Sequence, residues 1–207
     1  ELMARVRTHL KISYYQNALA QKNKELRQAN ETLLESKKQI ERAARTDSLT
    51  QLLNRREMMN CIRQEHIRLK RSGRPFALAL SDIDNFKQFN DRFGHDCGDS
   101  VLVSVSRIMR SAIRKQDLLA RWGGEEFLFV FPETDLGGGK TVCEKIRESI
   151  ANHVYEYKGR NLSVTMTFGV SLVPDHHKPI RDHIRNADTA LYRGKQQGKN
   201  CVKTFAQ

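Results

Sequence analysis

Residues 76–99 read FALALSDIDNFKQFNDRFGHDCGD, and this stretch decides the fold. It opens with a continuous apolar run, which predicts a buried β-strand that ends at Asp82 and Asp84. Because side chains alternate along a strand, both carboxylates should point to the same side and Ile83 to the other. Sheets present ligands at the ends of their strands, so the two aspartates mark a candidate binding site.

A second acidic pair lies in RWGGEEF at residues 121–127. The surrounding residues 117–132 predict a β-hairpin that turns at the two glycines. Glycines permit a tight turn and let a bulky anion approach the backbone closely. If Glu125 and Glu126 neighbour the two aspartates, three or four carboxylates converge and raise one another's pKa values unless a cation neutralises them. Hard oxygen ligands beside phosphates favour magnesium.

The flanking segments predict a chain that alternates between helices and strands. The stretch DSLTQLLNRREMM predicts a helix that is capped by Asp47 and runs to about Arg71. A second helical stretch follows the first strand and is broken near Gly94 and Gly98. The C-terminal part predicts helix, strand, helix and strand at residues 138–152, 162–172, 180–196 and 201–205. The expected fold class is α/β, with a central mixed sheet that contains an antiparallel hairpin.

Between the two acidic pairs lie a lysine, an amide, a histidine and a carboxylate: Lys87, Asn90, His95 and Asp99. Lys87 can meet a phosphate as a point charge, while Asn90 and Asp99 offer an amide and a carboxylate to the edge of a base. Guanine presents N1–H and an exocyclic amine as paired donors, whereas adenine has no N1 donor. The carboxylate of Asp99 therefore favours guanine.

Together, RWGGEEF, DxDxFKxxNDxxGHxxGD and DSLTQLLNRR resemble the GGDEF family of diguanylate cyclases, in the GGEEF variant. The resemblance covers residues 47–207. It implies the palm-like domain of nucleotidyl cyclases and polymerases. It also implies an enzyme that condenses two GTP molecules into cyclic di-GMP and two pyrophosphates across a homodimer.

The resemblance also implies roles for individual residues. Two Mg²⁺ ions, for which Mn²⁺ can substitute, would be held by Asp82, the Ile83 carbonyl and Glu125. Whether Asp84 also touches a metal is left open. Glu125 would be the general base and Lys87 would stabilise charge on the phosphates. Guanine would be held by Asn90 and Asp99, with His95 nearby.

The C-terminal block LYRGKQQGKN, residues 191–200, resembles the part of the family that reaches the terminal phosphate. It nominates Lys195 and Lys199. The family more usually has arginine at the second position, and lysine keeps the charge but loses the bidentate fork. The substitution can therefore weaken GTP binding, and loss of activity is not expected.

Arg114 and Asp117 fit the family's RxxD inhibitory site, with five residues between Asp117 and Gly123. An arginine can fork onto a guanine edge or a phosphate, and an aspartate can accept from the opposite edge. Arg147 on the following helix is a candidate for a second contact. The product would then inhibit the enzyme from a site distinct from the active site. The alternative is a catalytically silent cyclic di-GMP receptor that retains only this site.

Apolar residues recur every seven positions near the N-terminus, which predicts a coiled coil. The core positions are Ile12, Leu19, Leu26, Leu33 and Ile40, with Tyr15, Ala29 and Ala43 in the intervening position. We expect residues 1–46 to form a dimerising and signalling helix and residues 47–207 to form the cyclase domain. A single amphipathic helix packed on its own domain is the alternative. Residues 1–12 resemble the last helix of a response-regulator receiver domain, so an upstream receiver is expected.

The composition excludes several classes of protein. The net charge of +12 suggests a phosphate-rich partner, but the basic residues are interspersed with acids and no aromatics interleave them. We therefore expect no nucleic acid partner. A continuous apolar run long enough to span a bilayer is missing from the sequence, so a cytoplasmic protein without a membrane partner is expected. The scattered cysteines predict neither disulfides nor a structural metal.

Overall fold

The computed structural model describes the backbone of residues 2–205. Within the first helix it describes the side chains of residues 11, 19, 21–38, 40 and 45. Contacts divide the chain between residues 44 and 45 into two compact units. The first unit is helix α1 (Leu2–Arg45) up to that boundary, and the second contains every other element.

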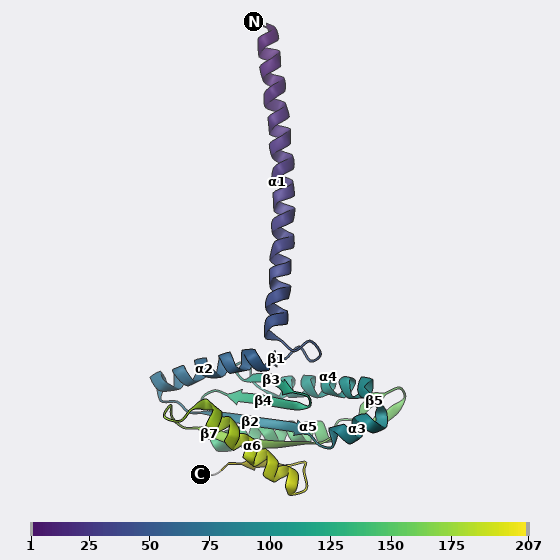
Figure 1. Ribbon diagram of the computed structural model, residues 1–207, viewed down its shortest axis with the longest axis vertical. Coiled ribbons are helices and arrows are strands. Elements are labelled where there is room, and N and C mark those ends of the chain that lie inside the picture. Colours follow the sequence, from purple (N-terminus) through teal and green to yellow (C-terminus); the bar gives the residue numbers. More distant parts are fainter. Residues whose placement is uncertain (1, 206–207) are drawn as a thin grey trace. The chain divides into compact units, whose positions relative to one another are not determined.

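The second unit is built on a six-stranded sheet with the strand order β1-β3-β4-β2-β7-β8 (Figure 1). The strands are β1 (Leu53–Asn54), β2 (Phe76–Ile83), β3 (Leu118–Gly123), β4 (Glu126–Phe131), β7 (Met166–Val173) and β8 (Val202–Thr204). The four central strands pair with one another in antiparallel orientation, whereas the edge strands β1 and β8 pair in parallel with β3 and β7. The predicted α/β fold, with a mixed sheet containing an antiparallel hairpin, is confirmed.

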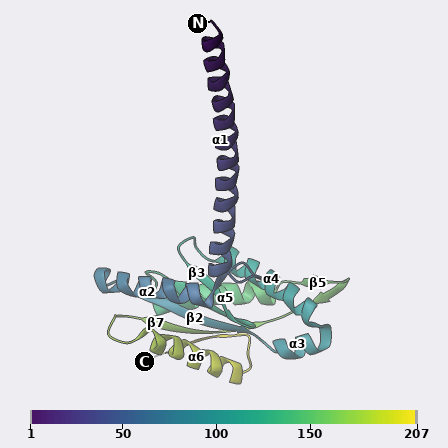
Figure 2. The ribbon, with the colours of Figure 1, turned by 45° about the horizontal axis from the view of Figure 1, so that its top comes forward.

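Helices cover both faces of this sheet (Figures 1 and 2). One face packs against α3 (Phe86–Phe93), α4 (His95–Ala112) and α5 (Leu136–Ala151), and the other against α2 (Arg55–Ser72) and α6 (Ile180–Gln196). Burial on both faces explains why the central strands are continuously apolar. In β4, Phe127 and Phe129 face one core while Leu128 and Val130 face the other. Each such side chain contributes about 1.5–3 kcal/mol by leaving water.

The structure corrects the predicted start of α2. The helix begins at Arg55, and the side chain of Asn54 caps it by accepting a hydrogen bond from the Glu57 N–H at 2.9 Å. Asp47 caps an earlier turn instead, where Oδ1 accepts from the N–H and the hydroxyl of Thr50, both at 2.8 Å. The reason is tertiary: Leu53 and Asn54 are held extended by parallel pairing with β3, so the helix cannot start before them.

Two further element boundaries also differ from the prediction. The helical stretch after β2 breaks only at Gly94, whose φ is +85°, and α4 continues through Gly98. The strand expected at residues 162–172 begins at Met166. It follows a small hairpin of β5 (Tyr155–Tyr157) and β6 (Arg160–Leu162), which was not predicted and which contacts α4.

Helix α1 exposes apolar side chains that recur every seven residues. Leu19, Leu26, Leu33 and Ile40 are 61–69% exposed in the single chain. Ile12, Tyr15 and Ala43, which complete the predicted seam, lie outside the described side chains. Between residues 2 and 205, no helix combines the length and the apolar character needed to cross a membrane.

Candidate functional site

The candidate site lies where β2 ends between the starts of β4 and β7. Asp82 pairs with Glu126 on one side and with Thr167 on the other. The backbone N–H of Ile83 donates to the Glu125 carbonyl at 3.4 Å. The two acidic turns quoted from the sequence are therefore neighbours, because antiparallel pairing brings the end of β2 beside the start of β4.

A lysine from the last turn of α6 occupies the space between the two aspartates. Lys195 Nζ donates to the Asp82 carbonyl at 3.2 Å, to Asp82 Oδ1 at 2.5 Å and to Asp84 Oδ1 at 2.7 Å. Among the side chains that the structure describes, no group of three acidic, histidine or cysteine residues lies close enough together to hold a metal. Asp82 and Asp84 surround the ammonium group of Lys195, and the charges of Glu125 and Glu126 act on the same cluster.

The electrostatics of this cluster favour an added cation. Burial raises the pKa of Asp82 above its usual value, the charges of Glu125 and Asp84 add to the rise, and Lys195 opposes it. Burial likewise raises the pKa of Glu126, with repulsion from Asp82. The carboxylate and carbonyl oxygens of Asp82 already surround one cation, the lysine ammonium. This all-oxygen donor set fits a hard divalent ion such as magnesium.

The second aspartate is in a different situation. Burial alone would raise the pKa of Asp84, but hydrogen bonds from Lys195, Thr167, Thr165 and the Asn200 N–H outweigh it and lower the pKa. Asp84 is 7% exposed, and these donors enclose its carboxylate. Asp82 and Asp84 therefore lie on the same side, as predicted, but have unequal access to solvent.

The glycine turn is held by an arginine of its own hairpin, which also pairs with an aspartate outside the hairpin. Arg121 Nε donates to the Gly124 carbonyl at 2.8 Å, and Nη1 lies 3.2 Å from Asp47 Oδ1. Gly124 has a φ of +50°, a conformation that glycine adopts without strain. Trp122 packs beneath the guanidinium of Arg55, whose Cζ is 4.5 Å from the ring centroid, and this supports a packing role for the tryptophan.

The residues predicted to bind the phosphates (Lys87) and the base (Asn90, His95 and Asp99) lie on α3 and α4. Lys87, His95 and Asp99 are exposed. Asn90 Oδ1, in contrast, is buried and has no hydrogen-bond partner. It faces Gly98, where an added Cβ would lie only 1.9 Å from it. A buried amide oxygen without a donor is costly, so a ligand that donates a hydrogen bond there fits the site.

Lys199 lies in a strained loop between α6 and β8. Gly198, Lys199 and Asn200 have φ values of +108°, +64° and +43°, a region that only glycine occupies readily. Lys199 Nζ donates to Asn85 Oδ1, directly after the Asp82–Asp84 pair. Both lysines of the C-terminal block therefore reach the end of β2.

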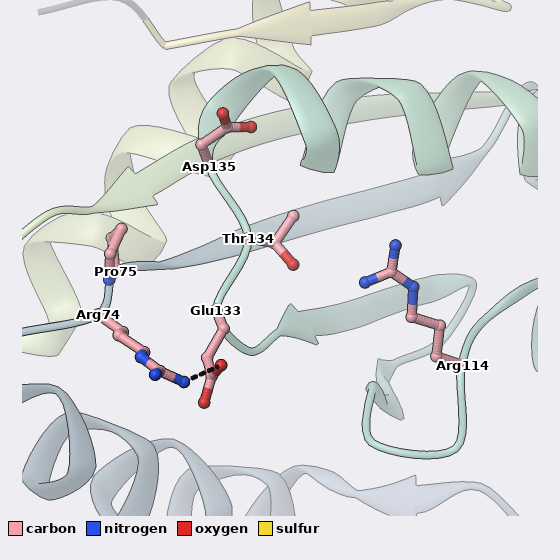
Figure 3. Close-up of a pocket in the computed structure, with 6 residues that line it drawn as sticks. All are labelled: Arg74, Pro75, Arg114, Glu133, Thr134 and Asp135. Carbon is pink, nitrogen blue, oxygen red and sulfur yellow. Dashed lines mark hydrogen bonds and ion pairs between the residues drawn. The ribbon is translucent and has the colours of Figure 1, made fainter. Parts of the chain in front are cut away.

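The predicted inhibitory pair forms a tight turn before β3. Asp117 is 3% exposed, and its Oδ2 accepts from the Arg114 N–H at 2.9 Å, so this oxygen stabilises the turn. The Arg114 side chain is exposed and extends toward Thr134, as Figure 3 shows. It lines a cavity of about 460 Å³ together with Arg74, Pro75, Glu133, Thr134 and Asp135.

Arg147, the candidate second contact, points elsewhere. Its guanidinium donates to Glu144 at 2.7 Å and to Asn200 Oδ1 at 3.1 Å. It is not among the residues that line the cavity beside Arg114. The structure therefore brings Arg147 to the loop that carries Lys199.

Sequence reasoning did not assign the residues that hold the site in place. Arg121 and Asp47 lie inside the quoted motifs, so the motifs signalled them without indicating that they pair. Asn200 ends the quoted C-terminal block without having been assigned a role, and Thr165 and Thr167 lie in none of the quoted motifs. They contribute because β7 and the loop before β8 lie beside the end of β2.

The chain matches the family model described as diguanylate cyclase, GGDEF domain, over residues 44–201. It is 38% identical over 175 residues to a curated protein of Vibrio cholerae named diguanylate cyclase, covering 84% of this chain and 54% of that relative. This chain thus spans about half the length of that relative.

Two solved structures are also similar. The coiled coil and GGDEF domain of DgcB from Caulobacter crescentus, in complex with c-di-GMP, is 29% identical with a TM-score of 0.81, and the match covers 91% of this chain and 98% of that one. The active GGEEF domain of a diguanylate cyclase from Vibrio cholerae is 35% identical with a TM-score of 0.71. That match covers 75% of this chain and 99% of the other.

Proposed function

Because this chain belongs to the GGDEF family of diguanylate cyclase domains, we propose that it condenses two GTP molecules into cyclic di-GMP and two pyrophosphates. One observation carries the proposal. Lys195 is held by the oxygens of Asp82 and Asp84 at the sheet edge where the GGEEF turn arrives. A phosphate-binding cation and a set of cation-binding oxygens thus lie side by side, as phosphoryl transfer requires.

The metal set would consist of Asp82, the Ile83 carbonyl and Glu125. The Ile83 side chain is 1% exposed in the core, so only its backbone is available to a ligand. Two magnesium ions, or manganese as a substitute, would neutralise the triphosphate and lower the pKa of the attacking hydroxyl.

The chain's own residues would then orient the reactants and move a proton. Glu125 takes the proton of a 3′-hydroxyl as its oxygen bonds to the α-phosphorus of the other GTP and the bond to pyrophosphate breaks. Lys87 stabilises the negative charge on the phosphates, and Lys195 and Lys199 bind the terminal phosphates. Two such transfers close the ring and release two pyrophosphates.

Guanine recognition would use the unpaired amide oxygen on α3. Asn90 Oδ1 accepts from a base donor, which satisfies a buried atom that is otherwise without a partner. Asp99, which follows the Gly98 that Asn90 faces, is exposed and accepts from the second donor of guanine, with His95 near the base. This pairing favours guanine over adenine, because adenine lacks the N1 donor.

Each domain would supply half of the reaction. One GTP per domain means that two domains must face each other, and a coiled coil of two α1 helices would make this encounter intramolecular. The exposed Leu19, Leu26, Leu33 and Ile40 fit this role, because pairing would remove their apolar surface from water. An upstream receiver domain would set the register of the helices.

Product inhibition would act through Arg114 and the turn that Asp117 stabilises. Arg114 offers free donors to a phosphate or a guanine edge beside an open cavity. The second candidate function is a catalytically silent cyclic di-GMP receptor that uses this site alone. The similar DgcB structure, which contains c-di-GMP, supports binding of that ligand by either kind of protein.

The test is to incubate the purified chain, freed of co-purified cyclic di-GMP, with GTP and magnesium. A Glu125→Gln variant is the matched control, because it keeps the size of the side chain and removes the base. Chromatography should detect cyclic di-GMP only with the unchanged protein. GTP left untouched by a confirmed dimer would favour the receptor.

A further inference from the structure

Hydrogen-bond donors from the described residues occupy all the acceptor sites of the Asp84 carboxylate. Its side chain is 2% exposed. Oδ1 accepts from Thr167 Oγ1 and from Lys195 Nζ, both at 2.7 Å. Oδ2 accepts from Thr165 Oγ1 at 2.7 Å and from the Asn200 N–H at 2.9 Å. A carboxylate offers about four acceptor sites, so all are used.

Asp82, two residues earlier, differs in the property that matters to a metal. Its side chain is 23% exposed, and the one partner of its carboxylate that the structure shows is Lys195. Asp82 can therefore turn oxygens toward a bound ion without losing other contacts. Asp84 would have to give up a buried hydrogen bond to do the same.

The donors around Asp84 come from three segments that are distant in the sequence. Thr165 directly precedes β7 and Thr167 lies at its start, Lys195 lies in the last turn of α6, and Asn200 lies before β8. The Asp84 N–H adds a bond of 2.8 Å to the Thr165 carbonyl. Asp84 thus joins the end of β2 to the segments that carry both phosphate-binding lysines.

One of these segments needs such an anchor. Three successive residues, Gly198 to Asn200, have positive φ, and non-glycine residues adopt that conformation only when their surroundings impose it. Asp84 Oδ2 holds the Asn200 N–H, and Arg147 holds the Asn200 side chain at 3.1 Å. The Lys199 side chain leaves this loop toward Asn85.

We propose that Asp84 is a positioning residue that orients Lys195 and the loop carrying Lys199 toward the triphosphate, and that it is not a metal ligand. The inference rests on the proposed function, because it assigns these lysines to phosphate. When a triphosphate binds, Lys195 exchanges its contact with Asp82 for a phosphate oxygen and keeps its contact with Asp84.

The test uses Asp84→Asn, which keeps the shape but replaces one oxygen by an NH₂ group. If the NH₂ group replaces Oδ1 it faces the Lys195 ammonium, and if it replaces Oδ2 it faces the Asn200 N–H. Neither of these groups can accept a hydrogen bond, so one contact is lost in either orientation. Binding of inorganic triphosphate in EDTA, measured by calorimetry, reports on the lysines without any metal. We expect Asp84→Asn to weaken it about 10- to 100-fold.

Asp82→Asn is the matched control. It removes a carboxylate that competes for Lys195, so triphosphate should bind at least as tightly in EDTA. With GTP present, Asp82→Asn should raise the magnesium concentration needed for half-maximal activity. Asp84→Asn should instead raise the KM for GTP at saturating magnesium.

Thr165→Val provides a second variant should Asp84→Asn fail to fold. It removes one donor to Asp84 Oδ2 from a partly exposed position, and triphosphate affinity should fall about 2- to 10-fold. Unchanged triphosphate binding in the folded variants, or a loss of magnesium affinity alone, would overturn the proposal. Failure of the unchanged chain to bind triphosphate would overturn it too. Absence of cyclic di-GMP with triphosphate binding still dependent on Asp84 would refute only the cyclase.

Discussion

Arg121 and Asp47 form an ion pair, with Nη1 3.2 Å from Oδ1, although 74 positions separate them in the sequence. Both side chains are about four-fifths buried. The same guanidinium donates to the carbonyl of Gly124 in the GGEEF turn. The loop that follows α1 is therefore connected, through one arginine, to the turn that carries Glu125.

Replacing Arg121 by lysine should slow the reaction. Lysine keeps the charge but cannot bridge Asp47 and Gly124 with one planar group, so the turn loses its support. We expect kcat to fall about 10-fold or more, because small displacements of a reacting group are costly. Steady-state formation of cyclic di-GMP measures this. A double-mutant cycle with Asp47→Asn should show coupling, and purely additive effects would argue against the bridge.

Gly98→Ala should weaken GTP binding. The new Cβ would lie 1.9 Å from Asn90 Oδ1, so the amide must leave its position beside the base. The KM for GTP should rise about 10-fold, because the loss of one hydrogen bond in a buried site weakens binding by about that factor. Gly137→Ala is the control, because its Cβ would meet only Asp135 Oδ1 at 3.7 Å. An unchanged KM in Gly98→Ala would show that Asn90 does not hold the base.

Arg114→Ala should relieve product inhibition. The variant removes exposed donors at the rim of the cavity without touching the hydrogen bond between the Arg114 backbone and Asp117. The cyclic di-GMP concentration that halves the rate should rise about 10-fold or more. Lys115→Ala, an exposed cation next to it, should leave that concentration nearly unchanged. If cyclic di-GMP inhibits Arg114→Ala as strongly as Lys115→Ala, the inhibitory site lies elsewhere.

Gly169→Ala should destabilise the domain. A Cβ at this position would lie 2.1 Å from the Ala187 carbonyl oxygen and 2.2 Å from the Leu191 nitrogen, and neither backbone atom can move alone. Helix α6 packs directly on β7 here. The free energy of unfolding in urea should fall by about 3 kcal/mol. Gly137→Ala should change it by no more than about 1 kcal/mol, and a similar small change in Gly169→Ala would show that α6 can shift.

Stability should fall in mild acid because of His183. Burial lowers the pKa of this histidine below its usual value of 6.5, although its hydrogen bond with the Leu172 carbonyl opposes the shift. The unfolded chain therefore binds a proton at a pH where the folded chain does not. The stabilisation is complete above pH 6.5 and is lost as the pH falls below it.

Urea unfolding between pH 7.5 and 5.5 measures this loss. His183→Gln should lower stability at pH 7.5 and flatten the pH dependence. Burial also lowers the pKa of His66, which is present in both proteins and whose charge adds to the lowering of the His183 pKa. His153→Gln, at an exposed position, is the control and should leave the dependence of the unfolding free energy on pH as in the unchanged chain. The same pH dependence in the unchanged chain and in both variants would exclude His183 as the cause.

The amino-acid sequence by itself determined most of the elements and the chemistry that they carry. The apolar run ending at Asp82 became β2, and the helix predicted at residues 180–196 is α6 (Ile180–Gln196). Both follow from the local spacing of apolar residues, which is visible in the sequence. The positions of the acidic pairs were also local features, because one pair follows an apolar run and the other follows two glycines.

Tertiary structure decided which of these groups meet. Lys195 lies between Asp82 and Asp84, which are more than 110 residues away, because β2 pairs with β7 and α6 packs on that strand. Nothing in the local spacing of the lysine indicates this contact. The start of α2 was decided in the same way, since pairing with β3 selected Asn54 over Asp47 as the cap. Local periodicity specifies which face of an element is buried, whereas register and packing specify the partner on that face.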